Sequence, residues 1–158
     1  MKKRICCIIS VLIVIIVLGI TVVQSNILYL AGRTPYPDAV TEMNGITMEL
    51  IGEPTAEQIC YRIINDSGST VYTGDMFELE YYFLGGWHRL RLRENATFNL
   101  NQWIINSPGE TEFADNPSLY YIKLPRGKYR LVKRIETAEI RTYEDRDKYF
   151  ILSLAFTY

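Results

Sequence analysis

Residues 124–133 read LPRGKYRLVK, a short turn followed at once by a strand pattern. Proline presets its own φ and glycine tolerates a positive φ, so the chain can reverse tightly before the first lysine. After the turn, Tyr129 and Leu131 alternate with Lys128 and Arg130, a spacing typical of a strand with one buried face. We therefore predict that Tyr129 and Leu131 lie in a core and that the two basic residues face water.

Similar short patterns separated by turns occupy the rest of the chain from residue 45. The alternating or apolar runs are residues 46–50, 59–63, 77–81, 87–92, 104–105, 111–113 and 149–156. Gly85-Gly86 predicts a tight hairpin between two of these runs. None of these segments has a convincing helical period. About seven short strands at intervals of roughly ten residues predict an all-β fold of two packed antiparallel sheets.

Several of these segments, in this order and spacing, carry a resemblance to a known family. They are residues 59–69, residues 77–80 with the Gly86-Trp87 hairpin, residues 96–99 and 107–110, residues 124–133, and the closing run 150–156. Residues 45–158 resemble the bacterial immunoglobulin-like domains, which occur as single extracytoplasmic modules behind a membrane anchor or lipoprotein signal in Gram-positive bacteria. The chain departs from them in an aromatic insertion at 115–121 and a charged hairpin tip at 139–148.

The resemblance implies an immunoglobulin-like antiparallel β-sandwich. In such folds a tyrosine at the start of a strand closes a corner, and its hydroxyl bonds back to the chain a few residues upstream. Tyr129 occupies that place, so we expect its hydroxyl to bond to the backbone of the preceding turn. The family has no known catalytic residues, and the resemblance therefore implies none in this chain.

The N-terminus has the pattern of a membrane anchor. Residues 5–23 are 19 consecutive uncharged residues, which as a helix span about 28 Å, close to the roughly 30 Å of a bilayer core. The basic residues 2–4 just before them orient the N-terminus to the cytoplasm and the remainder outside the cell. A signal peptide cleaved after Ser25 is the alternative. We therefore expect an anchor at 1–25, a Pro- and Gly-containing tether at 26–44 and the sandwich at 45–158.

Charge and composition exclude several functions. The formal net charge is −1, but 14 of the 17 basic residues and all 18 acidic residues follow residue 25, which leaves that part at −4. A mildly acidic body argues against nucleic-acid binding, which needs a basic face. One histidine and three cysteines argue against a zinc site and a disulfide framework. We therefore expect no metal, no cofactor and no nucleic-acid partner.

Catalytic patterns are also missing. His88 is the sole imidazole, and no nucleophile elbow such as Gly-x-Ser-x-Gly is present. The acidic residues at 144, 145 and 147 lack the spacing of a calcium loop. The favoured function is therefore a membrane-anchored extracytoplasmic binding module without catalytic activity. The alternative is a structural or regulatory ectodomain that partners another membrane or cell-envelope protein.

One group of residues suggests a ligand-facing surface. Trp87, Arg89, Arg91 and Arg93 alternate after the hairpin and would share one strand face. A basic, aromatic surface of this kind can bind an anionic cell-wall polymer or a lipid headgroup. The alternative is that these arginines pair across the hairpin with the glutamates at 78 and 80.

The predicted topology can be checked directly. Because residues 5–23 are long and apolar enough to stay in the bilayer, alkaline carbonate extraction should leave the full-length chain in the membrane pellet. A soluble mature form that begins near Asn26 would instead identify the segment as a cleaved signal peptide.

Overall fold

The computed structural model describes residues 9, 11–19, 30, 34–137 and 149–158. The chain divides into two compact units, Met1–Leu30 and Ala31–Tyr158. In the first unit, residues 9 and 11–19 are helical. Among the described residues, no helix is both long and apolar enough to cross a membrane. Residues 5–8, 10 and 20–23 of the predicted span lie outside the described residues, and the anchor stays a prediction.

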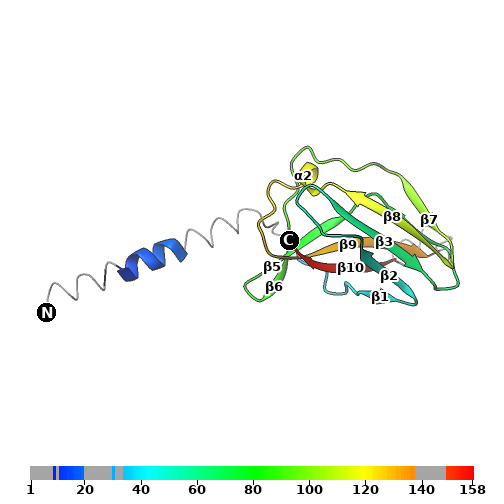
Figure 1. The fold of residues 1–158 in the computed structure, drawn as a ribbon, viewed down its shortest axis with the longest axis horizontal. Helices are drawn as coiled ribbons and strands as arrows, with labels where there is room; N and C mark the ends of the chain where they lie inside the picture. Colours follow the sequence, from blue (N-terminus) through cyan, green and yellow to red (C-terminus); the bar gives the residue numbers. More distant parts are fainter. Residues whose placement is uncertain (1–8, 10, 20–29, 31–33, 138–148) are drawn as a thin grey trace. The chain divides into compact units, whose positions relative to one another are not determined.

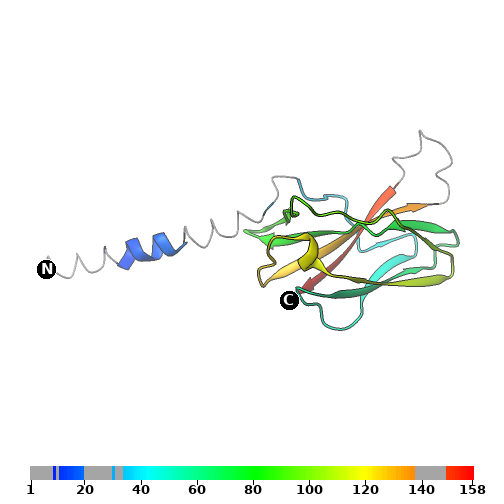
Figure 2. The same ribbon diagram turned by 90° about the horizontal axis from the view of Figure 1, so that it is seen from above.

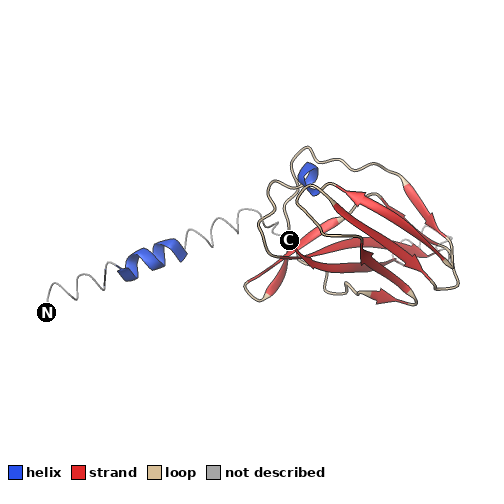
Figure 3. Ribbon diagram, in the orientation of Figure 1, coloured by secondary structure: helices blue, strands red, loops and turns tan. Residues whose placement is uncertain are grey.

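The second unit is an all-β sandwich of two antiparallel sheets, as predicted (Figure 1, with labels, and Figure 3). One sheet has the order β1-β2-β3-β8, and its strands are β1 (Glu42–Met43), β2 (Ile46–Leu50), β3 (Ile59–Asn65) and β8 (Gly109–Asp115). The other has the order β6-β5-β9-β4-β7, with β10 also paired to β9. Its strands are β4 (Val71–Gly74), β5 (Glu78–Phe83), β6 (Gly86–Arg89), β7 (Gln102–Ile105), β9 (Lys128–Thr137) and β10 (Tyr149–Thr157).

The described residues thus form ten strands, so the prediction of about seven is too low. The sequence pattern missed β1 and β4. Both are short, at two and four residues, and β4 ends in a glycine that looks like part of a turn. The aromatic insertion before β9 contains a short helix, α2 (Pro117–Tyr120), which Asn116 caps by accepting a hydrogen bond from the Ser118 N–H. The charged tip at 139–148 lies outside the described residues.

β9 is the central strand of the larger sheet, and Figure 2 shows it beside β10 (orange and red). Its other edge pairs with β5 near its start and with β4 near its end. Tyr129 and Leu131 are buried, and Lys128 is exposed, as the alternation predicts. Arg130 differs from the prediction, because only 12% of its side chain is exposed and it is ion-paired with the fully buried Glu80.

The corner before β9 is confirmed: the Tyr129 hydroxyl donates a hydrogen bond to the Pro125 carbonyl. Two further tyrosines bond to the carbonyls on either side of it. Tyr158 donates to the Leu124 carbonyl at 2.7 Å, and Tyr81 donates to the Arg126 carbonyl at 3.4 Å. The corner therefore has three successive carbonyls, each satisfied by a different tyrosine from three separate strands or strand ends.

Gly127 is needed in this corner because the Tyr81 ring lies directly against it. A Cβ at this position would sit 2.6 Å from a ring carbon of Tyr81, which is far inside van der Waals contact. The backbone of Gly127 also pairs in both directions with that of Tyr158, at 3.0 and 3.1 Å. Gly127, which the sequence analysis assigned to a turn, therefore also joins the corner to Tyr158.

Two boundaries differ from the sequence analysis. The hairpin between β5 and β6 turns at Leu84-Gly85, both with positive φ, and not at Gly85-Gly86, because Gly86 already pairs with Phe83. The predicted tether at 26–44 is too long, since its later part packs on the sandwich. The Val40 N–H donates to the Ile151 carbonyl at 2.9 Å in a parallel bridge to β10. A single bridge of this kind needs no alternation of apolar and polar residues, so the sequence pattern could not reveal it.

The corner predicts a graded response to substitution. Tyr129→Phe removes one hydrogen bond and keeps the ring, so the free energy of unfolding should fall by about 1 kcal/mol. Tyr129→Ala also leaves a cavity beside Phe156 and Tyr81, whose rings lie 5.7 and 5.2 Å from that of Tyr129, and should cost roughly 3–5 kcal/mol. Urea titration of the full chain measures both changes. Tyr82, at 41% exposure, provides matched control substitutions with small effects. Equal and negligible effects at Tyr129 would contradict its place in the core.

Candidate functional site

The larger sheet is interrupted between β4 and β5, and a groove lies on its outer face at this break. β4 and β5 run in the same direction along one edge of β9, with Thr73 opposite Ile135 and Glu78 opposite Val132. Four residues, 74–77, therefore lie opposite only two residues of β9. Gly74 still pairs with Gln102 of β7, and residues 75–77 form a bulge between β4 and β5. A groove of about 440 Å³ lies at this break. It is lined by the residues of β9 that alternate with the core-facing ones, so it opens on the outer face.

The groove has an apolar floor and a partly exposed apolar rim. Val132 and Ile151 form part of the floor and are 3% and 8% exposed. Met76 from the bulge and Tyr149 from β10 also line it, and they are 49% and 41% exposed. Leu100, in the segment that leads into β7, is fully exposed. A concave, mainly apolar surface of this volume is typical of a small-molecule site and can also hold one or two side chains of a partner.

Polar contacts hold the two sides of the groove in place. Asp75 in the bulge accepts hydrogen bonds from the Asn101 side chain at 2.7 Å and from the Trp103 indole. These bonds attach the segment before β7 to the break. At the opposite side, the Arg134 guanidinium lies 3.8 Å from the centre of the Tyr149 ring. Side-chain contacts therefore hold the segments on both sides of the groove in place.

A buried lysine supports the break from the core side. Lys133 is 1% exposed, and its ammonium donates a hydrogen bond to the carbonyl of Gly74, where β4 leaves the sheet. The Lys133 nitrogen lies 4.9 Å from the centre of the Phe113 ring. Burial lowers the pKa of Lys133 to about 8, although the charge of Asp115 opposes the shift. Asp115 itself accepts a hydrogen bond from Tyr61 at 2.8 Å, and burial raises its pKa.

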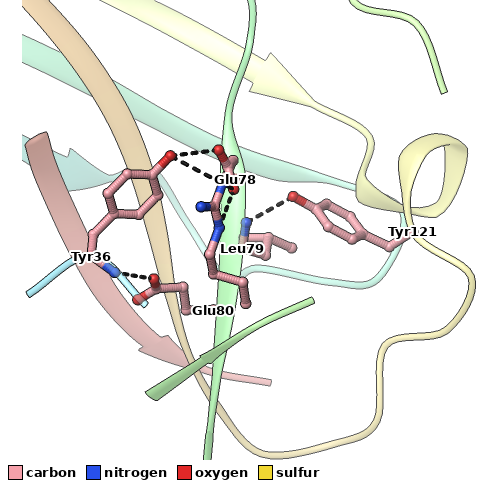
Figure 4. A network of polar contacts seen from close by, with 6 residues as sticks. Tyr36, Glu78, Leu79, Glu80 and Tyr121 are labelled. Carbon is pink, nitrogen blue, oxygen red and sulfur yellow. Dashed lines mark hydrogen bonds and ion pairs between the residues drawn. The ribbon is translucent and has the colours of Figure 1, made fainter. Parts of the chain in front are cut away.

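Beside the groove, the segment before β1 lies on the same outer face through Tyr36 (Figure 4). The Tyr36 N–H donates to Glu80 at 2.8 Å, and its hydroxyl donates to Glu78 at 2.7 Å. Arg89 pairs with Glu78 and lies 4.5 Å over the Tyr36 ring. Arg130 pairs with Glu80 and donates to the Tyr36 carbonyl at 2.7 Å. Every polar group of Tyr36 is thus bonded, and Tyr36 lines the groove.

Burial shifts the ionisation of the tyrosines in this region. Desolvation, and next the hydrogen bond to Glu78, raise the pKa of Tyr36 to about 12. Tyr121 is 2% exposed, and its hydroxyl oxygen accepts the N–H of Leu79 at 2.8 Å (Figure 4). Burial raises the pKa of Tyr121 well above its usual value. Both hydroxyls are therefore neutral at physiological pH and act as hydrogen-bonding groups.

The structure does not bring the four predicted ligand-facing residues together as a free basic stripe. Arg89 is ion-paired with Glu78, which confirms the cross-strand alternative for this residue, whereas Glu80 pairs with Arg130 of β9. Trp87 is half-buried, with its ring 4.9 Å from the Arg130 guanidinium.

Arg91 and Arg93 are both exposed, and the Arg93 side chain donates to the Tyr121 carbonyl at 3.0 Å. A ligand-binding role for these four residues stays a prediction.

Sequence reasoning missed Tyr36 and the groove, because Tyr36 lies outside any periodic run and the groove comes from a mismatch between strands. The proline on either side of Tyr36 was the available signal of an ordered segment.

Three further candidates from the sequence are the imidazole of His88, the thiol of Cys60 and possible metal ligands. The His88 Nε2 lies 3.1 Å from the Phe83 carbonyl, at the end of the β5-β6 hairpin. Cys60 is a free, half-buried thiol on β3. In residues 34–137 and 149–158, as in the described part of the N-terminal unit, no group of three His, Cys, Asp or Glu side chains could hold a metal ion.

The two-layer antiparallel sandwich with its tyrosine corner defines an immunoglobulin-like fold. The family model described as bacterial Ig-like domain matches residues 42–147, and the chain belongs to that family. The match begins at β1 and ends just before β10. No curated protein matches the chain. Membership of this family indicates an interaction or structural module.

The buried lysine makes stability depend on alkaline pH. Lys133 has a pKa near 8 in the folded state and an ordinary value of 10.5, so between these values the unfolded chain binds the extra proton. The free energy of unfolding should therefore rise from pH 8 to pH 10, by on the order of 2 kcal/mol. Above pH 10 the buried tyrosines oppose this trend, because the unfolded state then loses their protons more readily.

Urea titrations of the full chain at pH 8, 9 and 10 measure the slope. Lys133→Met should flatten it, and Lys128→Met, at an exposed position of the same strand, should keep it. A slope unchanged in Lys133→Met would contradict the assignment of the titration to this residue.

Proposed function

We propose that the protein is a membrane-anchored extracytoplasmic binding module without catalytic activity, and that it holds its ligand in the groove at the break between β4 and β5. The groove carries this proposal, because it joins a concave apolar floor to exposed apolar residues on the face of a rigid sheet. The ligand is a component of the cell envelope, either a protein segment or a polymer. The apolar run at residues 5–23 supports the anchored topology.

The surroundings of the groove suit binding rather than chemistry. Its acidic residues are engaged: Asp75 with Asn101 and Trp103, and Glu136 with Arg134 at 3.1 Å. Glu78 is held by Arg89 and Tyr36. A general acid or base needs a carboxyl group within reach of substrate and with a matched pKa. Carboxylates already paired for structure favour a recognition role.

Site-specific photocrosslinking tests the proposal in cells. A photoreactive phenylalanine analogue at Tyr149 replaces one aromatic ring of the groove by another, and the full chain is irradiated in its native membrane. We expect an adduct at Tyr149 and none at Leu119, which is 63% exposed on α2 and lies outside the groove. Met76→Arg, which places a long charged side chain in the groove, should abolish the adduct.

His88→Gln is the matched control for catalysis and should leave the adduct and the cellular function unchanged. Equal adducts at Tyr149 and Leu119 would contradict a specific groove. An adduct that disappears when residues 1–25 are exchanged for an unrelated anchor would favour the alternative, a regulatory ectodomain whose transmembrane segment forms part of the contact. Complete loss of function in a folded His88→Gln variant would point to an enzyme.

A further inference from the structure

Among the described residues, β7 is the edge strand that has no protection against pairing with another strand. A strand at a sheet margin leaves alternate backbone N–H and C=O groups open to another strand, and proteins protect such margins with charges, proline or covering segments. In the described residues, β8 carries three acidic side chains and β6 ends in Arg89. β1 has only two residues, and the segment at Val40 covers β10. These four margins are therefore charged, short or covered.

β7 has four residues and lacks charge, proline and a covering segment among the described residues. Among the described residues it pairs on one side only, with β4. Residues 99–106 contain neither a charged residue nor a proline. The large apolar side chains here are exposed: Trp103 at 41%, Ile104 at 59% and Leu100 completely. Met76, on the neighbouring bulge, is 49% exposed. An open backbone edge flanked by exposed apolar side chains fits an extended strand as its occupant.

We propose that β7 pairs antiparallel with β7 of a second copy of this chain, which joins the two larger sheets into one. A two-fold axis through the pair matches each edge with itself. Because the edge has no charge, self-pairing brings no like charges together. It also places Trp103 and Ile104 of one copy beside those of the other. A second copy therefore satisfies both the backbone edge and the exposed apolar residues.

The size of this edge sets the strength of the contact. A strand of four residues with its flanking side chains buries less than the 1,200–2,000 Å² typical of a stable interface, so the pairing should be weak in dilute solution. Confinement of the copies to a membrane plane raises their effective concentration, and in this respect the inference depends on the proposed anchor.

Leu100 and Gln102 belong both to the groove and to this edge, so pairing brings two grooves close together. A polymeric ligand could then bind two grooves at once.

Sedimentation of the full chain in mild detergent over a range of concentrations measures the pairing. We expect a monomer–dimer equilibrium in the unmodified chain. Ile104→Lys places a charge on the edge and should weaken the dimer at least tenfold. Leu119→Lys introduces the same charge at an equally exposed apolar residue on α2 and should leave the dimer unchanged. Should Ile104→Lys fail to fold, Gln102→Lys places the charge at another exposed position of β7.

Three results would overturn the proposal. The first is a monomer at all concentrations, and the second is a dimer that both edge variants leave intact. The third is a dimer lost only when residues 1–25 are exchanged, which would assign the contact to the anchor. A photoreactive residue at Ile104 that captures a different protein in cells, with no dimer present, would assign the edge to that partner. None of these results depends on the groove ligand, so the two proposals fail separately.

Discussion

The rest of the sandwich depends on the place where β9 begins. The Tyr129 hydroxyl is bonded to the Pro125 carbonyl, and Gly127 lies against the Tyr81 ring where no side chain fits. Together these contacts fix the first residue of β9 and the face on which its side chains lie. Since β9 pairs with β10 on one edge and with β5 and β4 on the other, its register sets that of three further strands. A shift by one residue would move every core side chain of β9 to the outer face.

The same strand produces the candidate site. β5 and β4 share one edge of β9 but differ in register, and the difference appears as the bulge at 75–77. Pairing of β4 with β9 ends at Thr73, although Gly74 still pairs with Gln102 of β7, and a buried carbonyl at such a break needs a partner. Lys133 supplies it from the core side of β9. The groove on one side of the sheet and the buried lysine on the other are therefore two consequences of one irregularity. In natural proteins such bulges often occur beside functional sites.

Local patterns predicted much of this fold. Alternation identified the strands around Ile59, Leu79, Tyr129 and Phe156, and the turn before β9 predicted its tyrosine corner. β1 and β4, of two and four residues, escaped detection because neither short run shows a period. Tyr36 escaped for a different reason. Four of its hydrogen bonds join it to residues 42 to 94 positions away, and nothing in the local sequence marks such partners.

The sequence by itself determined the two-sheet class, the corner, the acidic character of residues 26–158 and the apolar N-terminal run. These properties reside in local alternation, turn residues and composition, which the amino-acid order displays directly. Only the tertiary structure decided which arginine pairs with which glutamate, so that Arg89 of the expected basic stripe is ion-paired with Glu78. It also created the groove and left β7 as an uncharged margin. Each of these features depends on register between strands far apart in the chain, and register is set by packing of the whole sandwich.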